Sequence, residues 1–186
     1  MFRSLIRLGW RYDRAMSRSV ALLAFALAAL GCSSSNPPLD VAQGVELTRF
    51  QGAWYEVAHL SRSTQLDCVG TKAYYKLVDG ANLEVIHECH TKTVDGPTSA
   101  SRVTARVPDG AVPAKWTMSF GGHEGDYWIL EIGDKYEYAV VGHPSRRYLW
   151  ILSRTPKLDP MVLAGILDRT RDKQFPVDKL EYTPQP

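Results

Sequence analysis

The series of short β-prone runs from Gln51 onward constrains the fold of this chain most strongly. The runs are rich in Val, Ile, Thr, Tyr, Phe and Trp, and Gly, Pro, Asn and Asp separate them at steady intervals. This spacing is typical of an antiparallel barrel or sandwich, because such turn residues reverse the chain between adjacent strands. Eight strands are predicted, in sequential hairpins that favour an up-and-down order, at 53–60, 68–78, 82–91, 99–107, 114–121, 125–132, 136–142 and 147–154.

One helix is predicted after the last strand. Asp159 and Pro160 form an N-cap and first-turn pair. Apolar positions then recur at helical spacing, so one face is expected to pack on the wall of the sheet. That face consists of Leu163, Ile166, Leu167 and Thr170. Pro176 ends the helix, and residues 177–182 are predicted to add a short extended segment.

The N-terminal segment has the layout of an export signal. Arginines precede an apolar run from Val20 to Leu30, and small residues lead into Gly31 and Cys32. Eleven apolar residues are too few for a permanent membrane span. We therefore expect a signal peptide at 1–31, and a start at Met16 would give it a more compact basic region.

Cys32 and the polar residues after it resemble the lipobox and flexible tether of bacterial lipoproteins, in which that cysteine is acylated. The match departs from the usual pattern at Ala29, where such signals carry a larger aliphatic residue. Cleavage after Ala-Leu-Ala at 26–28 remains an alternative. The expected organisation is a lipidated tether at 32–39 followed by one domain at 40–186. In a Gram-negative species, Ser33 resembles the signal for outer-membrane sorting, with the domain facing the periplasm.

Composition is that of a folded globular domain, with 45% hydrophobic and 23% charged residues in 186. The formal net charge of +2 does not describe the folded part. Residues 1–31 carry five arginines and one aspartate, so the remainder has a net charge of about −2. Such a body has no basic excess for binding nucleic acid.

Three blocks, in order and at family spacing, resemble the lipocalin family. Gly52-Ala53-Trp54 matches the Gly-x-Trp signature of the first strand, after an expected short 3₁₀ segment at about 40–50. Residues 134–138 match the second block in part, because Gly133 and Lys135 replace its usual Thr and Tyr. Residues 148–156 resemble the last strand of bacterial lipocalins and apolipoprotein D-like members. The resemblance covers residues 40–182.

The resemblance implies an all-β fold: an eight-stranded antiparallel up-and-down barrel with one C-terminal helix packed outside. It also implies that Arg154 lies over the ring of Trp54 at the closed end, where the pair stabilises the structure. A cation–π contact of this kind is worth about 0.5–2 kcal/mol.

Period-two alternation predicts the side chains that face the interior of the barrel. The inward set is Glu56, Ala58, Ala73, Tyr75, Val85, His87, Trp116, Met118, Phe120, Trp128, Tyr148, Trp150 and Leu152. Of these, we expect ligand contacts from Glu56, Tyr75, Val85, His87, Trp116, Met118, Trp128, Tyr148 and Trp150. This apolar and aromatic lining suits an acyl chain, with the polar members fixing a head group. A fully packed core has the same pattern, so ligand binding rests on the resemblance.

Cys68 and Cys89 flank one predicted hairpin, and an exported protein with two such thiols most simply forms a disulfide. A catalytic cysteine, as in lipocalin-type prostaglandin synthases, is the rival interpretation. His87 and His90 point to opposite faces of a strand, which excludes a two-histidine metal clamp there. A haem site would have only His87 as an axial ligand.

We expect a binding protein rather than an enzyme, with no cofactor and no metal. The first hypothesis is a membrane-anchored lipoprotein of the cell envelope. Its barrel would take up a fatty acid, a lysophospholipid or a similar hydrophobic molecule for storage, transport or membrane maintenance. The alternative is a filled barrel whose open-end loops bind another protein.

Overall fold

The fold is taken from a computed structural model that describes residues 36–60, 67–108, 110–120 and 122–186. The predicted signal peptide and Cys32 lie outside these residues. Within the described part, no helix is both long and apolar enough to cross a membrane.

The described residues form nine strands, and the eight predicted ones are confirmed to within about two residues at each end. They are β1 (Gly52–Leu60), β2 (Cys68–Leu77), β3 (Asn82–Thr91), β4 (Thr98–Arg106), β5 (Lys115–Phe120), β6 (His123–Ile132), β7 (Tyr138–Gly142), β8 (Leu149–Ser153) and β9 (Glu181–Tyr182). The shortest predicted strand starts later than expected because Tyr136 has a φ of 60° and belongs to the turn.

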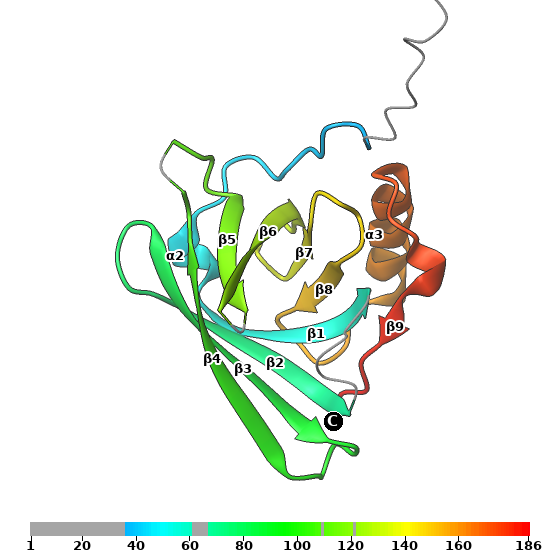
Figure 1. Ribbon diagram of the computed structural model, residues 1–186. Coiled ribbons are helices and arrows are strands. Elements are labelled where there is room, and N and C mark those ends of the chain that lie inside the picture. Colours follow the sequence, from blue (N-terminus) through cyan, green and yellow to red (C-terminus); the bar gives the residue numbers. More distant parts are fainter. Residues whose placement is uncertain (1–35, 61–66, 109, 121) are drawn as a thin grey trace, which may run out of the picture. The chain divides into compact units, whose positions relative to one another are not determined.

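The first eight strands close into a barrel. Each is antiparallel to the next in sequence, and β1 also pairs with both β2 and β8, so the ring is complete. Figure 1 shows these strands surrounding a common interior, with helix α3 (Pro160–Asp172) against the outer wall. The predicted eight-stranded up-and-down barrel is therefore confirmed, with β9 as an additional strand on β1.

The helical segments differ in two respects from the prediction. The segment before β1 is a single α-helical turn, α2 (Leu47–Phe50), and the 3₁₀ helix expected at 40–50 is wrong. Helix α3 begins as predicted, since the Asp159 carboxylate accepts hydrogen bonds from the backbone amides of Met161 and Val162. The extended segment predicted at 177–182 is wrong in its first half, because Val177–Lys179 form a 3₁₀ turn that leads into β9.

Two apolar clusters lie on opposite sides of the barrel wall. The inner cluster fills the barrel and includes Trp54, Tyr75, Trp116, Tyr127 and Leu152. The outer cluster joins the wall to α3 through Leu130, Val140, Ile151 and Ile166. Strands β6, β7 and β8 are therefore apolar on both faces.

Two predicted inward positions are wrong, and a β-bulge accounts for the first, because it changes which side chains face inward. A shift between Glu56 and Ala58 leaves Ala58 in the outer cluster. On β6, Tyr127 and Ile129 belong to the inner cluster, so Trp128 packs outward against the outer one. The ring of Trp128 also lies 4.4 Å from the ammonium of Lys115.

Candidate binding site in the barrel

One end of the barrel is closed by a group of side chains that we call the plug: Phe50, Trp54 and Arg154. The Arg154 guanidinium lies 3.8 Å from the centre of the Trp54 ring, as the resemblance predicted. It also donates hydrogen bonds to the carbonyls of Arg49, Phe50, Ala53 and Tyr136. Trp54 donates its indole N–H to the Phe50 carbonyl at 2.7 Å. Arg154 therefore ties α2 to both ends of the strand meander.

Aromatic rings extend from the plug through the interior. Phe50 contacts the Trp116 ring edge-on at 4.9 Å, and Trp116 stacks on Tyr127 at 6.1 Å. Tyr127 then meets Trp150 at 5.4 Å, and Trp150 stacks on Tyr148 at 6.5 Å. This aromatic column connects the plug to the opposite end of the barrel, which we call the mouth. Aromatic side chains therefore occupy the interior in a continuous series from the plug to the mouth.

A pair of tyrosine hydroxyls lies inside the column. Tyr75 and Tyr127 share a hydrogen bond of 2.6 Å, and both side chains are buried. Burial raises the pKa of both phenols, and the Glu56 carboxylate adds to the effect. The pair therefore stays neutral and satisfies two polar groups that would otherwise be costly in this core.

Exposure of inward-facing side chains increases from the plug to the mouth. Val85, Trp116 and Met118 near the plug have 0% of their surface exposed, so no water-sized space adjoins them. Near the mouth, His87, Tyr148 and Trp150 are partly exposed. Ser99 and Ser101, on the same face of β4 as the buried Ala105, are exposed. The plug half is packed, and the mouth half is open to solvent.

The seam between β4 and β5 contributes to this opening. The two strands pair only through Ala105 with Met118 and Arg106 with Thr117, next to the plug. The neighbouring pair β3–β4, in contrast, extends along the whole of both strands. The inner face of β4 is therefore accessible toward the mouth.

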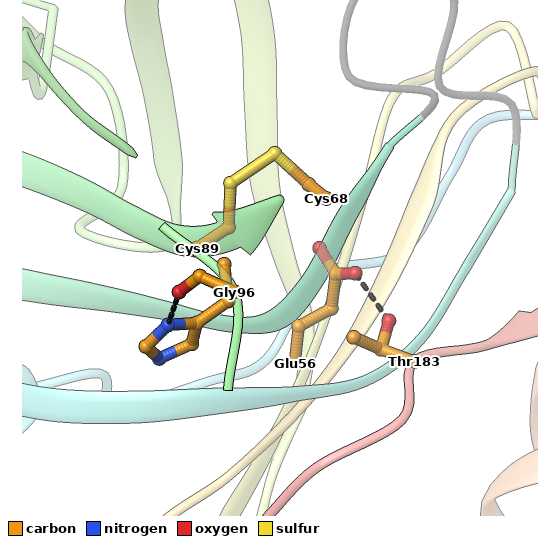
Figure 2. The surroundings of a disulfide bond; sticks show 6 residues. Glu56, Cys68, Cys89, Gly96 and Thr183 are labelled. Atoms are coloured by element: carbon orange, nitrogen blue, oxygen red, sulfur yellow. Dashed lines mark hydrogen bonds between the residues drawn. A yellow bond between two sulfur atoms is a disulfide. The ribbon is translucent and has the colours of Figure 1, made fainter. Parts of the chain in front are cut away.

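A buried polar cluster lies on β1 near the mouth. The Glu56 carboxylate accepts a hydrogen bond from the Thr183 hydroxyl (Figure 2). Its Oε1 also lies 3.1 Å from Nδ1 of His59. Gln185 donates its side-chain amide to the carbonyls of Glu56 and Thr71. The C-terminal residues thus join β1 to β2 where these strands no longer pair with each other.

The disulfide and His87 lie on the strands next to this cluster. Cys68 and Cys89 form the predicted disulfide, which connects β2 and β3 (Figure 2). Both thiols are thereby occupied, which removes the nucleophile that the catalytic-cysteine interpretation needed. Burial lowers the pKa of His87, and Glu56 opposes that shift. Among the described residues, no group of three or more His, Cys, Asp or Glu is arranged to hold a metal ion.

The expected ligand residues divide into three groups in the structure. His87, Tyr148 and Trp150 face the open mouth half, whereas Trp128 faces outward. Glu56, Tyr75, Val85, Trp116 and Met118 are buried inside. The side chain of Phe120, also predicted to face inward, is not among those that the structure describes. Sequence reasoning missed Tyr127 and Thr183, and the apolar residues on both sides of Tyr127 concealed its inward position.

Comparison with known proteins agrees with this architecture. Residues 45–185 match the model of the lipocalin-like domain. The outer membrane lipoprotein Blc of Escherichia coli K12 is 31% identical over 175 residues, covering 91% of this chain and 98% of the relative. Temperature-induced lipocalin-1 of Arabidopsis thaliana is 30% identical and covers 79% of this chain and 83% of its own.

More distant similarities support the same fold. Mouse apolipoprotein D is 26% identical and covers 80% of this chain and 82% of its own. The structure of insecticyanin from the tobacco hornworm Manduca sexta superposes with a TM-score of 0.63 at 22% identity. The superposition covers 81% of this chain and 86% of insecticyanin. The chain belongs to the lipocalin family.

Proposed function

We propose that this protein binds a single-chain lipid, a fatty acid or a lysophospholipid, in the mouth half of its barrel. The observation that carries the proposal is the gradient of exposure along the inner face, from the packed plug to the accessible Trp150 and Tyr148. Lipocalin membership supports a hydrophobic ligand in that position. The role would be storage, transport or membrane maintenance, and it involves binding rather than catalysis.

The packing of the plug half favours a single acyl chain. Phe50, Trp54 and Trp116 are fully buried and fill the cross-section of an eight-stranded barrel, which is only wide enough for side chains or one small ligand. A ligand would then lie against Trp150, Tyr148 and the disulfide. Apolar walls with few polar groups are usual in such pockets. Contacts with Val85, Trp116 or Met118 would require these side chains to move.

Polar groups near the mouth suit a head group that donates and accepts hydrogen bonds. Ser99 and Ser101 are exposed on the inner face of β4, and Ser101 pairs with His87 across the β3–β4 ladder. Hydroxyls can bond to a phosphate, a glycerol or a carboxylate. Glu56 lies deeper on β1 and is buried with Thr183.

We further propose that the chain is anchored in the cell envelope through acylated Cys32. The apolar run Val20–Leu30, followed by Cys32 and a serine-rich tether, supports this proposal. The names of the Blc relatives, outer membrane lipoproteins, agree with it. The envelope would supply the lipid partner directly.

Tryptophan fluorescence tests binding in the full chain carrying Cys32→Ala, which removes the anchor that would compete for the site. Lysophosphatidylcholine and palmitate are titrated, with a soluble sugar as the negative control. Saturable quenching is expected with either lipid. Trp150→Phe should remove most of the change, whereas the matched variant Trp128→Phe, which alters an outward ring, should preserve it.

The outcome distinguishes two functions. Quenching that disappears with Trp150→Phe and persists with Trp128→Phe supports lipid binding in the mouth half. If neither lipid changes the fluorescence of the folded protein, the lipid-binding proposal is wrong. The filled barrel that binds another protein through its loops would then be the better hypothesis.

A further inference from the structure

We propose that the mouth of the barrel faces a phospholipid bilayer and that the N-terminal segment holds it there. The proposal rests on the acylated Cys32 proposed above and adds an orientation, and hence a membrane-contacting surface. That surface consists of the two mouth-end connections that are described in full, residues 92–97 and 143–148.

The first described residues are fixed to the mouth end. Arg146 lies in the connection between β7 and β8, which is on the opposite side of the barrel from the plug. It donates hydrogen bonds to the Pro37 and Pro144 carbonyls at 2.6 Å each and to the Lys173 carbonyl at 3.3 Å. Its side chain is only 7% exposed. Buried arginine donors of this kind hold a segment firmly, because breaking the contacts leaves a charge without partners.

Two further contacts hold the same segment. Asn36 donates its side-chain amide to the Ser145 carbonyl at 3.5 Å. Leu39 is buried in the outer cluster beneath α3. The first described residue, Asn36, therefore lies beside the mouth, and Leu39 lies against the outer wall.

Chain length limits how far the anchor can lie from this point. Four peptide steps separate Cys32 from Asn36, which is at most about 14 Å when fully extended. A ten-residue strand such as β3 is about 33 Å long, or about 25 Å along the axis of a barrel with tilted strands. An anchor at Cys32 thus reaches the bilayer from the mouth end, and the plug end lies beyond its range.

Charge at the two ends favours the same orientation toward an anionic surface. The described mouth connections carry two exposed basic residues, Lys92 and Arg147, and one exposed acidic residue, Asp95. The plug-end turns at 78–81 and 133–137 carry one exposed basic residue, Lys135, and three exposed acidic residues: Asp79, Asp134 and Glu137. Anionic lipids attract basic segments and repel acidic ones near the surface. Tyr148, partly exposed at the mouth, is also a residue type that is enriched at membrane interfaces.

The experiment compares fluorescent labels at the two ends of the full-length lipoprotein. The chain is produced in a Gram-negative bacterium and extracted from membranes. It is then reconstituted into phosphatidylcholine–phosphatidylglycerol vesicles that contain a headgroup-labelled quencher lipid. One variant carries the label at Arg147→Cys and the matched variant at Lys135→Cys. Quenching of the mouth label is expected to be at least five-fold stronger than quenching of the plug label.

A longer tether provides the control. Inserting 20 Gly/Ser residues between Ser35 and Asn36 gives the anchor a reach of about 25 Å even as a random coil. The difference between the labels should then fall below two-fold. Protein that floats with the vesicles and shows equal or stronger quenching at Lys135→Cys overturns the orientation alone. Protein that does not float shows that the lipid anchor, and the orientation with it, is wrong, while ligand binding is judged by the separate titration.

Discussion

The Arg154 guanidinium lies 3.8 Å from the centre of the Trp54 ring and donates hydrogen bonds to the backbone carbonyls of Arg49 in α2, Ala53 on β1 and Tyr136 in the β6–β7 turn. The two residues come from the first and the last parts of the barrel meander, so their contact closes the plug end. No ligand is needed to explain this arrangement. We expect the pair to stabilise the fold as the hydrophobic core does.

Replacing Arg154 with Met should lower the free energy of unfolding by about 2–4 kcal/mol, because it removes the cation–π contact and leaves partly buried carbonyls without donors. Urea denaturation measures the loss. Arg102→Met is the matched control, since it removes only an exposed ion pair with Glu84 and should cost less than about 1 kcal/mol. Equal losses in the two variants would contradict a structural role for the plug.

The disulfide should contribute to stability and not to any chemistry. Replacing both Cys68 and Cys89 with Ser opens a loop with a sequence separation of 21 residues and should cost about 3 kcal/mol. Each single Cys→Ser variant should lose a similar amount, which thermal unfolding will show. Full stability of the double variant would contradict this prediction.

The buried tyrosine pair predicts a loss of stability at alkaline pH. Burial raises the pKa of Tyr75 and Tyr127 in the folded state, whereas unfolded tyrosine ionises near pH 10. Stability is therefore fully present below about pH 10 and falls as the pH rises further, because the unfolded state then binds fewer protons. The double variant Tyr75→Phe, Tyr127→Phe should show a shallower decline in urea midpoints between pH 9 and 11.

Two controls make this test specific. Tyr182→Phe changes a tyrosine that is 56% exposed and should leave the pH dependence unaltered. Tyr75→Phe alone leaves the Tyr127 hydroxyl buried and should cost about 1–3 kcal/mol at neutral pH, more than the double variant does. A decline as steep in the double variant as in the original protein would show that other groups dominate.

His87 predicts the opposite dependence at acid pH. Burial lowers its pKa, so the folded state resists protonation while the unfolded state takes up a proton near pH 6.5. Its contribution is present above that pH and is lost as the pH falls through the folded value. His87→Gln should therefore flatten the decline in stability between pH 7 and 5, and His123→Gln, on an exposed residue, should not. Parallel curves for all three proteins would refute this role.

Much of the barrel is predictable because strand spacing and turn chemistry are local properties of the sequence. Asp79, for example, accepts hydrogen bonds from the amides of Ala81 and Asn82 and so forms the turn that its Asp-Gly sequence predicts. Whether an individual side chain points into the barrel or outward is less predictable. Period-two alternation predicts an inward Trp128, but β6 is apolar on both faces because α3 covers its outer side. Alternation carries no information on such a strand.

Contacts between distant parts of the chain were beyond sequence reasoning. Thr183 and Glu56 are separated by 127 residues, and nothing in the local pattern of either indicates their hydrogen bond. Arg146 and Pro37 are separated by 109 residues, and the arginine is in an otherwise ordinary turn. These two hydrogen bonds, both near the mouth, can therefore be identified only from the three-dimensional structure.

The C-terminal residues should hold β1 and β2 together by hydrogen bonding to both strands. The Gly70 amide donates to the Pro184 carbonyl at 2.7 Å, and the Thr183 amide donates to the Val57 carbonyl at 3.0 Å. Ending the chain after Leu180 removes both contacts, so amide exchange at Gly70 should accelerate at least ten-fold while Val85 in the barrel wall stays protected. Thr183→Val removes only the hydroxyl donor to buried Glu56 and should cost about 2 kcal/mol. Unchanged exchange at Gly70 in the truncated chain would mean that β1 and β2 hold together without the C-terminal residues.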